Sequence, residues 1–263
     1  MQHAMRIAIG VEYDGRGFHG WEAQRHGRTV QQVLDSALAR VADAPVRTVC
    51  AGRTDARVHA LAQVAHFDTQ AVRSGRSWVL GANSNLPRDV SVLWAQPMDA
   101  AFHARFSAAS RSYRYVLLNH AVRPAALHGR VAWESRPLDV DVMARAAREL
   151  VGEHDYSAFR AAACQARTAV RTVHRLEVWR AGGFVLLDVR ANAFLQHMVR
   201  NLAGVLIAVG SGKQPVDWAA QVLAGRDRRH GGVTAPAEGL YLTGVDYPPH
   251  FAVPRLSPRF ALW

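Results

Sequence analysis

Lysine, cysteine and long apolar runs are all scarce in this chain of 263 residues. The two cysteines, Cys50 and Cys164, form neither a disulfide framework nor a metal-binding set, which favours a reducing, cytoplasmic setting. The most apolar run, residues 202–210, has about half of the length that a bilayer requires. The N-terminus has no basic segment followed by an apolar one, so we expect neither a signal peptide nor a membrane partner.

Acidic residues are outnumbered, with 21 Asp and Glu against 32 Lys and Arg, for a net charge of +11. Lys213 is the single lysine, so 31 of the basic residues are arginine. A basic chain indicates a polyanionic partner, usually a nucleic acid. A GC-rich coding sequence would enrich arginine and alanine as well, so the charge favours nucleic acid without establishing it.

The motifs of several enzyme classes are missing. GSGKQP, residues 210–215, lacks the upstream glycine and the following Ser or Thr of a phosphate loop, and we interpret it as a helix end and a turn. The 13 histidines show no HxxxH or HxH spacing, and there is no G-x-S-x-G elbow or dinucleotide fingerprint. We therefore expect no metal and no small-molecule cofactor.

Hydrophobic periodicity predicts the order strand, helix, strand, strand, helix, strand, and predicts it twice. The first set is 6–13, 28–41, 47–51, 63–68, 74–86 and 89–98, and the second is 111–119, 138–152, 168–180, 184–192, 194–210 and 239–247. This order is typical of the ferredoxin-like, or split βαβ, topology. The prediction is an α+β chain with a ferredoxin-like domain at 1–104, a second at 105–247 and a proline-rich tail at 248–263, with a groove between the two sheets.

Local signals mark the ends of several of these elements. Thr29 and Gln32 fit a capping box at the start of helix 28–41. Asp139 is a plausible cap for helix 138–152, with Gly152 as its stop. Gly182 and Gly183 indicate a hairpin between strands 168–180 and 184–192.

The stretch AGRTDARVHA, residues 51–60, places Asp55 on a tight loop directly after an apolar strand. Functional side chains are often found at such positions. A free carboxyl has a pKa of about 3.9, so Asp55 is an anion at neutral pH and is suited to act as nucleophile or general base. An Asx-turn or a helix cap explains the same aspartate, and both interpretations stay open at this point.

Two further stretches carry candidate site residues. RSYRY, residues 111–115, places Arg111, Tyr113 and Tyr115 on one face of a strand, with Arg114 on the other. Such strands can stack bases and hold phosphates, although half-buried tyrosines on an edge strand are an equal alternative. In NAFLQHMVRN, residues 192–201, Arg200 lies in an otherwise apolar helix, where a charge either has a partner or reaches to solvent.

These stretches together resemble the tRNA pseudouridine synthase A family. The stretches that carry the resemblance are YDGRGFHGWEAQ (13–24), TVQQVLDSAL (29–38), AGRTDARVHA (51–60), FHARFSA (102–108), RSYRY (111–115), NAFLQHMVRN (192–201) and TAPAEGLYL (234–242). The resemblance implies two ferredoxin-like halves around a basic cleft, a homodimer, and one tRNA that touches both subunits. The implied activity is isomerisation of uridine to pseudouridine at positions 38, 39 and 40 of the tRNA anticodon stem-loop, without a cofactor.

The resemblance also implies a role for each candidate residue. Asp55 matches the nucleophilic aspartate, and Arg53 matches the arginine that enters the space of the flipped base. Tyr113 matches the tyrosine that packs on the uracil and assists deprotonation. Arg200 matches the basic residue that pairs with the catalytic carboxylate, and Leu240 matches an apolar wall of the pocket. Arg111 and Arg114, which flank Tyr113, are candidates for substrate binding.

One residue departs from the family pattern GRTDAGVHA: Arg57 stands where the family has glycine. If that backbone requires a positive φ, arginine costs about 1–2 kcal/mol there. A non-catalytic tRNA-binding or tRNA-folding protein of the same fold remains the alternative function, because the basic cleft and the tyrosine strand would serve both. The sequence leaves open which tRNAs and positions are preferred, whether attack is at C1′ or C6, and what the tail 248–263 does.

Overall fold

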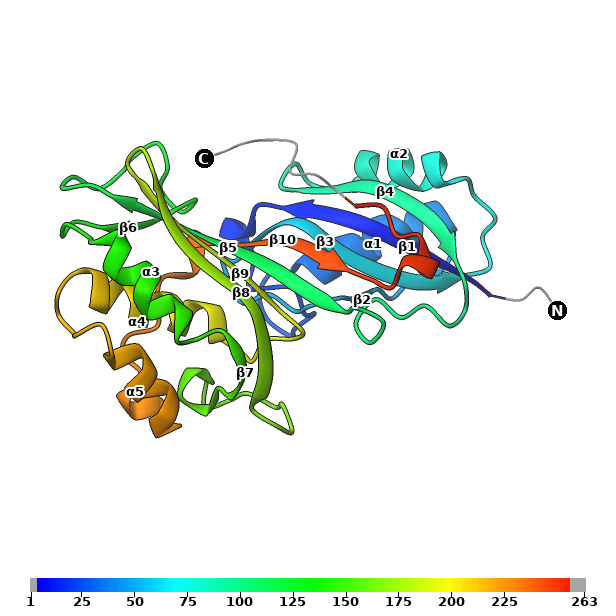
Figure 1. Ribbon diagram of the computed structural model, residues 1–263. Helices are drawn as coiled ribbons and strands as arrows, with labels where there is room; N and C mark the ends of the chain where they lie inside the picture. The colour runs from blue at the N-terminus through cyan, green and yellow to red at the C-terminus, as the bar shows by residue number, and fades with distance from the viewer. Residues whose placement is uncertain (1–3, 256–263) are drawn as a thin grey trace. The chain divides into compact units, whose positions relative to one another are not determined.

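The computed structural model describes residues 4–255, which form ten β-strands and five α-helices, so the predicted α+β class is confirmed. The described chain divides into two compact units (Figure 1). The first unit takes in residues 4–111 and 242–255, and the second takes in residues 112–241. Residues from both ends of the chain therefore build the first unit.

The first unit contains the predicted strand and helix order. Its elements are β1 (Met5–Tyr13), α1 (Val30–Ala42), β2 (Val49–Cys50), β3 (His59–Thr69), α2 (Gly75–Asn85) and β4 (Val90–Met98). β1 lies between β4 and β3 and is antiparallel to both, and β2 pairs with β3 through Val49 opposite His66. In the strand order β10, whose residues 242–246 belong to this unit, follows β3.

Alternation along β1 gives this sheet two buried faces. Ile7 and Ile9 are 1% and 0% exposed and share one face, because side chains two apart on a strand point the same way. Helix α1 buries Leu34 and Leu38 completely. The predicted capping box is present: Thr29 accepts from the Gln32 backbone, and Gln32 accepts from the Thr29 backbone.

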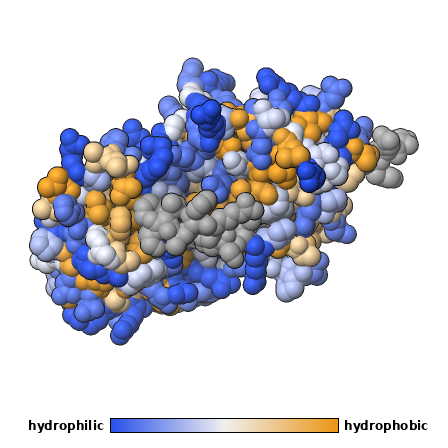
Figure 2. Space-filling model, turned by 90° about the horizontal axis from the view of Figure 1, so that it is seen from above, coloured by the Kyte–Doolittle hydropathy of each residue, from blue (hydrophilic) through white to orange (hydrophobic). Residues whose placement is uncertain are grey.

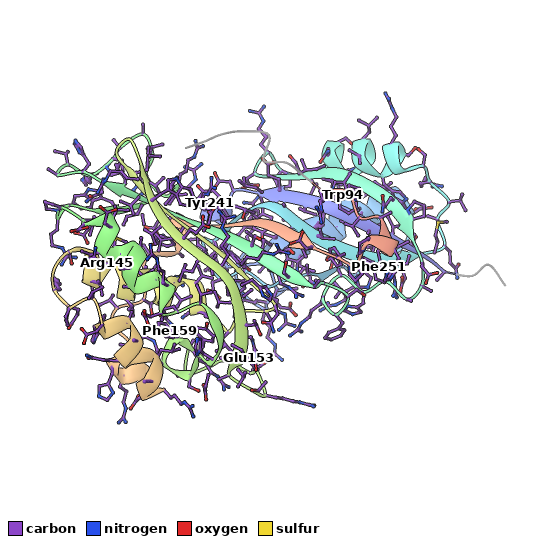
Figure 3. The ribbon with its side chains drawn as sticks, in the orientation of Figure 1. Trp94, Arg145, Glu153, Phe159, Tyr241 and Phe251 are labelled. Atoms are coloured by element: carbon purple, nitrogen blue, oxygen red, sulfur yellow. The ribbon has the colours of Figure 1, made fainter. Side chains whose placement is uncertain are left out.

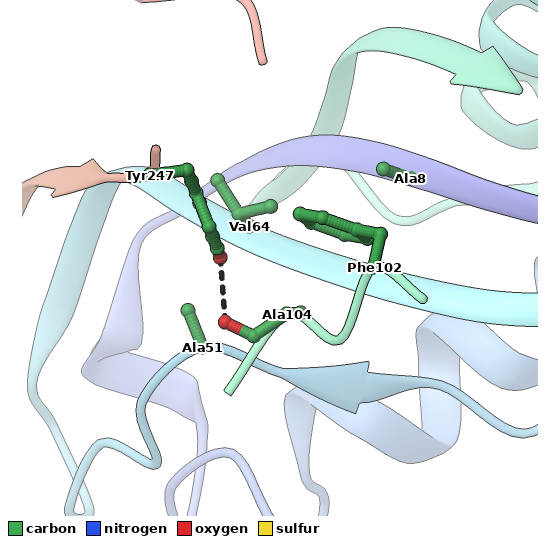
Figure 4. Packing of buried hydrophobic residues seen from close by; sticks show 6 residues of the cluster. All are labelled: Ala8, Ala51, Val64, Phe102, Ala104 and Tyr247. Atoms are coloured by element: carbon green, nitrogen blue, oxygen red, sulfur yellow. Dashed lines mark hydrogen bonds between the residues drawn. The ribbon is translucent and has the colours of Figure 1, made fainter. Parts of the chain in front are cut away.

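The other face of the sheet is covered by the residues around the end of β4 and by the end of the described chain. One cluster of buried residues joins Ala8, Ala51, Val64, Phe102, Ala104 and Tyr247 (Figure 4). The Tyr247 hydroxyl donates to the Ala104 carbonyl over 2.6 Å. Trp94 on β4 and Phe251 in the turn Pro249–Phe251 both pack against this cluster (Figure 3).

The second unit has more strands and helices than were predicted. In chain order its elements are β5 (Ser110–Asn119), β6 (Ala132–Glu134), α3 (Val140–Arg148), β7 (Gly152–Asp155), β8 (Val170–Ala181), β9 (Phe184–Ala191), α4 (Met198–Gly210), α5 (Trp218–Gly225) and β10 (Leu240–Asp246). It shares β5 and β10 with the first unit. The strand order is β5-β9-β8-β7, with β6 parallel to β5. The Gly182–Gly183 hairpin between β8 and β9 is confirmed.

Several predicted boundaries in this unit are wrong. Asp139 caps α3 as expected, but the helix ends at Arg148. Gly152, the predicted stop, has a φ of 119° and begins β7 instead. Helix α4 begins at Met198 rather than at residue 194, because His197 before it has a φ of 62°. Strands β6 and β7 and helix α5 were missed.

On the face drawn in Figure 2, hydrophilic residues surround smaller hydrophobic groups. Among residues 4–255 no helix combines the length and the apolar character needed to cross a membrane. Residues 248–255 of the predicted tail are described, and residues 256–263 lie outside the described residues.

Candidate active site

The loop that carries Asp55 runs between β2 and β3, and buried side chains hold its start. Gln63, which is fully buried on β3, donates to the Gly52 carbonyl over 2.7 Å and accepts from the Gly52 N–H over 3.4 Å. The Arg111 guanidinium donates to the Ala51 carbonyl through Nε and Nη2, over 3.3 and 3.0 Å. Both backbone groups of Gly52 and the carbonyl before it therefore have fixed partners.

The middle of the loop rests on the segment that follows β1. The Thr54 hydroxyl is 2.7 Å from the Tyr13 hydroxyl, and the Thr54 carbonyl accepts from the Trp21 N–H over 3.0 Å. Gly20 has a φ of 97°, and a Cβ on it would lie 2.7 Å from the Thr54 carbonyl oxygen. Only glycine allows this close approach. Thr54, directly before Asp55, is therefore held through its hydroxyl by Tyr13 and through its carbonyl by Trp21.

Asp55 itself is half-buried and lies at the first position of a tight turn. Its carbonyl accepts from the Val58 N–H over 3.2 Å, and the Arg57 N–H donates to the Phe18 carbonyl over 3.2 Å. Arg57 has a φ of 67°, so the position does require the left-handed backbone that glycine favours. Arginine adopts that backbone here, and the loop keeps its hydrogen bonds.

Arg53 forms an ion pair that the sequence did not indicate. Its Nε and Nη2 lie 2.8 and 2.9 Å from the two carboxylate oxygens of Glu22, and both side chains are substantially exposed. An exposed pair of this kind contributes about 0–1 kcal/mol, so little free energy is needed to open it. Glu22 lies within YDGRGFHGWEAQ, one of the stretches that carry the resemblance, which is the signal that could have found it.

In the second unit, Arg200 lies in the first turn of α4 and is bound to the segment before β10. Its Nε donates to the Ala235 carbonyl over 2.8 Å, and the Ala235 N–H donates to the Arg200 carbonyl over 3.1 Å. The expectation that Arg200 lies in a largely apolar helix is confirmed. This reciprocal pair fixes the backbone of both residues.

A buried asparagine beside Arg200 organises the same segment. Asn201 is 0% exposed and donates to the Phe159 carbonyl over 2.7 Å. Its side-chain oxygen accepts from Arg228 Nη2 over 3.0 Å and from the Thr234 hydroxyl over 2.7 Å. Sequence reasoning missed Asn201, Arg228 and Thr234, although Asn201 and Thr234 lie in two of the stretches quoted above.

Both tyrosines of RSYRY, on strand β5, are buried. Tyr115 is fully buried, its hydroxyl donates to the Pro236 carbonyl over 2.9 Å, and burial raises its pKa. Tyr113 is 8% exposed and its ring meets Phe194 edge-on, with centroids 5.1 Å apart. Leu240, the first residue of β10, is 5% exposed.

The two arginines of this strand have protein partners. Arg111 is 8% exposed and donates to backbone carbonyls of its own unit, at Ala51, Arg105 and Ala108. Arg114 forms a two-bond ion pair with Asp188, at 2.7 and 2.8 Å, and its guanidinium lies over the Trp179 ring. Both guanidiniums therefore contact protein groups in this structure.

The seven predicted site residues fall in both units. Arg53, Asp55 and Arg111 belong to the first unit, whereas Tyr113, Arg114, Arg200 and Leu240 belong to the second. Within the first unit, Arg53 and Asp55 are brought together on one loop, and Arg111 holds the start of that loop. Among residues 4–255, no group of three or more His, Cys, Asp or Glu side chains is arranged to hold a metal.

A family model described as tRNA pseudouridine synthase matches residues 9–107 and 146–248 of the chain. The chain belongs to this family. The matched ranges contain four of the seven predicted site residues, and they include the whole of the Asp55 loop.

Relatives of the family resemble the chain over nearly its whole length. A tRNA pseudouridine synthase A of Nitrosococcus oceani is 57% identical over 98% of this chain and 100% of its own length. A protein of the same name from Coxiella burnetii is 55% identical over 97% of this chain and 98% of its own. Another, from Pseudomonas aeruginosa, is 52% identical over 97% of this chain and 90% of its own.

A distant structural likeness was also found. A chain of the crystal structure of a Cbf5-Nop10-Gar1 complex aligns with 89% of this chain and 57% of its own length, at 12% identity and a TM-score of 0.36. A likeness this remote carries no information about function.

Proposed function

We propose that the chain isomerises uridine to pseudouridine at positions 38, 39 and 40 of the tRNA anticodon stem-loop, with Asp55 as the nucleophile. The observation that carries the proposal is the Asp55 loop of a family member: a half-buried carboxylate on a turn whose flanking backbone is held by Gln63, Trp21 and Phe18. A nucleophile fixed in this way needs little reorganisation before it attacks.

The chemistry balances without any added reactant. The Asp55 carboxylate attacks either ribose C1′ or uracil C6, and the bond between N1 and C1′ breaks. The detached uracil turns, a bond forms between C5 and C1′, and the bond to Asp55 breaks and frees the carboxylate. The proton on C5 leaves, and N1 gains a proton, so the product has the same composition as the substrate. The product is an isomer of the substrate, so the reaction requires no redox cofactor, nucleotide or metal.

Arg53 serves the step in which the target base leaves the helical stack, at a cost of a few kcal/mol. Its ion pair with Glu22 opens, and the guanidinium stacks and contacts phosphate in the space of the flipped base. Tyr113, Arg200 and Leu240 act from the second unit in the roles that the resemblance implies. Arg111 and Arg114 would bind RNA only after their hydrogen bonds to Ala51 and Asp188 open. Before that, they support the protein segments around the proposed site.

The remaining features of the proposal concern assembly. We propose two ferredoxin-like halves around a basic cleft, acting as a homodimer in the cytoplasm. The strand and helix order of the first unit and the net charge of +11 support the first part. Nonspecific binding by such a cleft weakens as salt rises, because phosphate contacts release counterions.

The test is tritium release from tRNA labelled at uracil C5, comparing wild type with Asp55→Asn and Asp55→Ala. Joining C5 to the ribose must expel that hydrogen. We expect release by the wild type, none by either variant, and tRNA binding largely preserved in Asp55→Asn. Binding without release by the wild type would instead support the non-catalytic tRNA-binding protein.

A further inference from the structure

The turn at residues 102–107, which follows β4, presents an aromatic side chain to solvent. Phe106 is 76% exposed, the second most exposed of the large hydrophobic side chains in the described chain after Val233 at 81%. The His103 ring stacks on it with centroids 4.3 Å apart and an interplanar angle of 28°. The Arg105 guanidinium lies 5.6 Å from the centre of the same ring. An exposed ring flanked by a stacked imidazole and a cation is suited to receive another flat ring.

The backbone of this turn is held by hydrogen bonds made within the turn. The Arg105 and Phe106 N–H groups both donate to His103 Nδ1, over 3.2 Å each. The Ser107 N–H donates to the His103 carbonyl over 2.9 Å, and the His103 N–H donates to the Ser107 hydroxyl over 3.0 Å. Phe106 is therefore presented by a closed turn, so ordering it on binding costs little conformational entropy.

Buried residues anchor the same turn to the first unit. Phe102, at its start, is 0% exposed in the cluster with Tyr247, whose hydroxyl binds the Ala104 carbonyl (Figure 4). His66 Nδ1 accepts from the Ala104 N–H over 3.1 Å, and Arg6 Nη1 donates to the Phe102 carbonyl over 2.8 Å. The protein fixes the turn on its inner side and leaves Phe106 outside.

One guanidinium ties this turn to the Asp55 loop. Arg111 Nη2 donates both to the Arg105 carbonyl and to the Ala51 carbonyl. The rigid aromatic turn and the loop of the proposed nucleophile thus share a buried support in the same unit.

We propose that Phe106, backed by His103 and flanked by Arg105, stacks on an unpaired base of the substrate RNA next to the target uridine. The inference rests on the proposed function, and it extends that function to a second contact. Unpaired bases stack on aromatic side chains, and a neighbouring arginine neutralises the adjacent phosphate. The net charge of +11 favours RNA over an apolar protein partner at this turn.

The experiment uses the full-length chain carrying Asp55→Asn, so that the RNA stays unmodified, and an anticodon stem-loop RNA with 2-aminopurine at successive loop positions. Stacking on Phe106 changes the fluorescence of 2-aminopurine at one of these positions. We expect Phe106→Ala and Phe106→Leu to lose that signal and to weaken binding about tenfold, whereas Phe106→Trp and Phe106→Tyr stay within about twofold. Leu80→Ala, at another exposed apolar residue of the same unit, is the matched control and leaves binding unchanged.

Three outcomes would overturn the inference. If Phe106→Ala binds RNA as tightly as the wild type, Phe106 makes no contact with the RNA. If Phe106→Leu binds as tightly as the wild type, the contact is a general apolar one and not stacking. A loss of the wild-type oligomer in Phe106→Ala, seen by sedimentation, assigns the turn to an interface between copies. A failure of the proposed function can be told apart from a failure of this inference, because it would appear as absent tritium release by the wild-type protein. Phe106 packs little of its surface, so unchanged melting temperatures verify that the variants fold.

Discussion

The Arg57 N–H donates to the Phe18 carbonyl over 3.2 Å while the Arg57 backbone stands at a φ of 67°. The family has glycine at this position, and the hydrogen bond shows that the chain retains a glycine-type turn after the substitution. The strain of the left-handed arginine is therefore part of the cost of holding Asp55 in place.

Arg57→Gly should stabilise the protein by about 1 kcal/mol, because glycine adopts a positive φ without the clash of a Cβ. Chemical denaturation measures the change, and tritium release should be at least as fast as in the wild type. Arg57→Ala is the matched control: it removes the charge but keeps the Cβ, so its stability should stay near that of the wild type. Equal stability of the glycine and alanine variants would mean that the turn carries no strain.

Glu22→Gln should free Arg53 for RNA. The variant removes one negative charge beside the loop and keeps the side chain's size, so we expect tRNA binding to tighten about threefold at low salt. The free energy of unfolding should change by less than about 1 kcal/mol, since the pair is exposed. In an Arg53→Gln background the gain in affinity should shrink, and an undiminished gain would show that Glu22 acts independently of Arg53.

The stability of the first unit should fall in acid because of His66. Burial, followed by the charge of Arg6, lowers the pKa of His66 from 6.5 to about 4, and its Nδ1 accepts from the Ala104 N–H. Between these two pKa values the unfolded chain binds more protons than the folded one, so stability is full above about pH 6.5 and declines towards pH 4. The loss amounts to about 3 kcal/mol, because each unit of pKa difference corresponds to about 1.4 kcal/mol.

Urea denaturation at a series of pH values compares wild type with His66→Gln. Glutamine can still accept the Ala104 N–H, but it does not titrate, so the decline below pH 6.5 should become shallower. His103, whose pKa burial also lowers, contributes in the same direction in both proteins. Identical slopes in the two proteins would remove His66 as the cause.

Asn201→Ala should destabilise the protein by about 2–3 kcal/mol, because it removes the hydrogen bonds of a buried side chain to Phe159, Arg228 and Thr234. The segment at Ala235 that binds Arg200 loosens with it, so we also expect slower tritium release. Thr234→Val removes the hydroxyl's bonds to Asn201 and Arg228 but leaves the other two bonds of Asn201, so it should cost less, about 1 kcal/mol. A stable Asn201→Ala protein with normal turnover would show that this network does not position Arg200.

Local signals in the sequence were sufficient for the elements with strong periodicity. Helix α1 was predicted from its apolar face and its capping box, and β8 and β9 from the two glycines between them. Strand β7 was missed because its four residues, GEHD, show no alternation of apolar and polar side chains. The start of α4 was misplaced because nothing in the sequence marks the left-handed backbone of His197.

The sequence provided candidate residues for the site but not the residues that support them. The stretch GRTDA singled out Asp55 and Arg53 as candidates. The stretch 13–24 pointed to the segment that holds Glu22, but no spacing in the sequence shows that Glu22 or Gln63 contacts the loop. The sequence left open whether residue 57 needs a positive φ, and the structure shows a φ of 67° there. Such contacts form only when segments far apart in the sequence come together in the fold, and no short pattern in a single sequence shows which segments do so.

The first unit takes residues from both ends of the chain, and this has a consequence for biosynthesis. Tyr247 and Phe251 cover the buried cluster around Phe102, so that surface stays open on the ribosome until nearly the whole chain has emerged. The unit that is synthesised first is therefore completed last, whereas domains usually fold in order of synthesis. A nascent chain stalled before residue 242 would hold the Asp55 loop without the strand and the tyrosine that complete its unit.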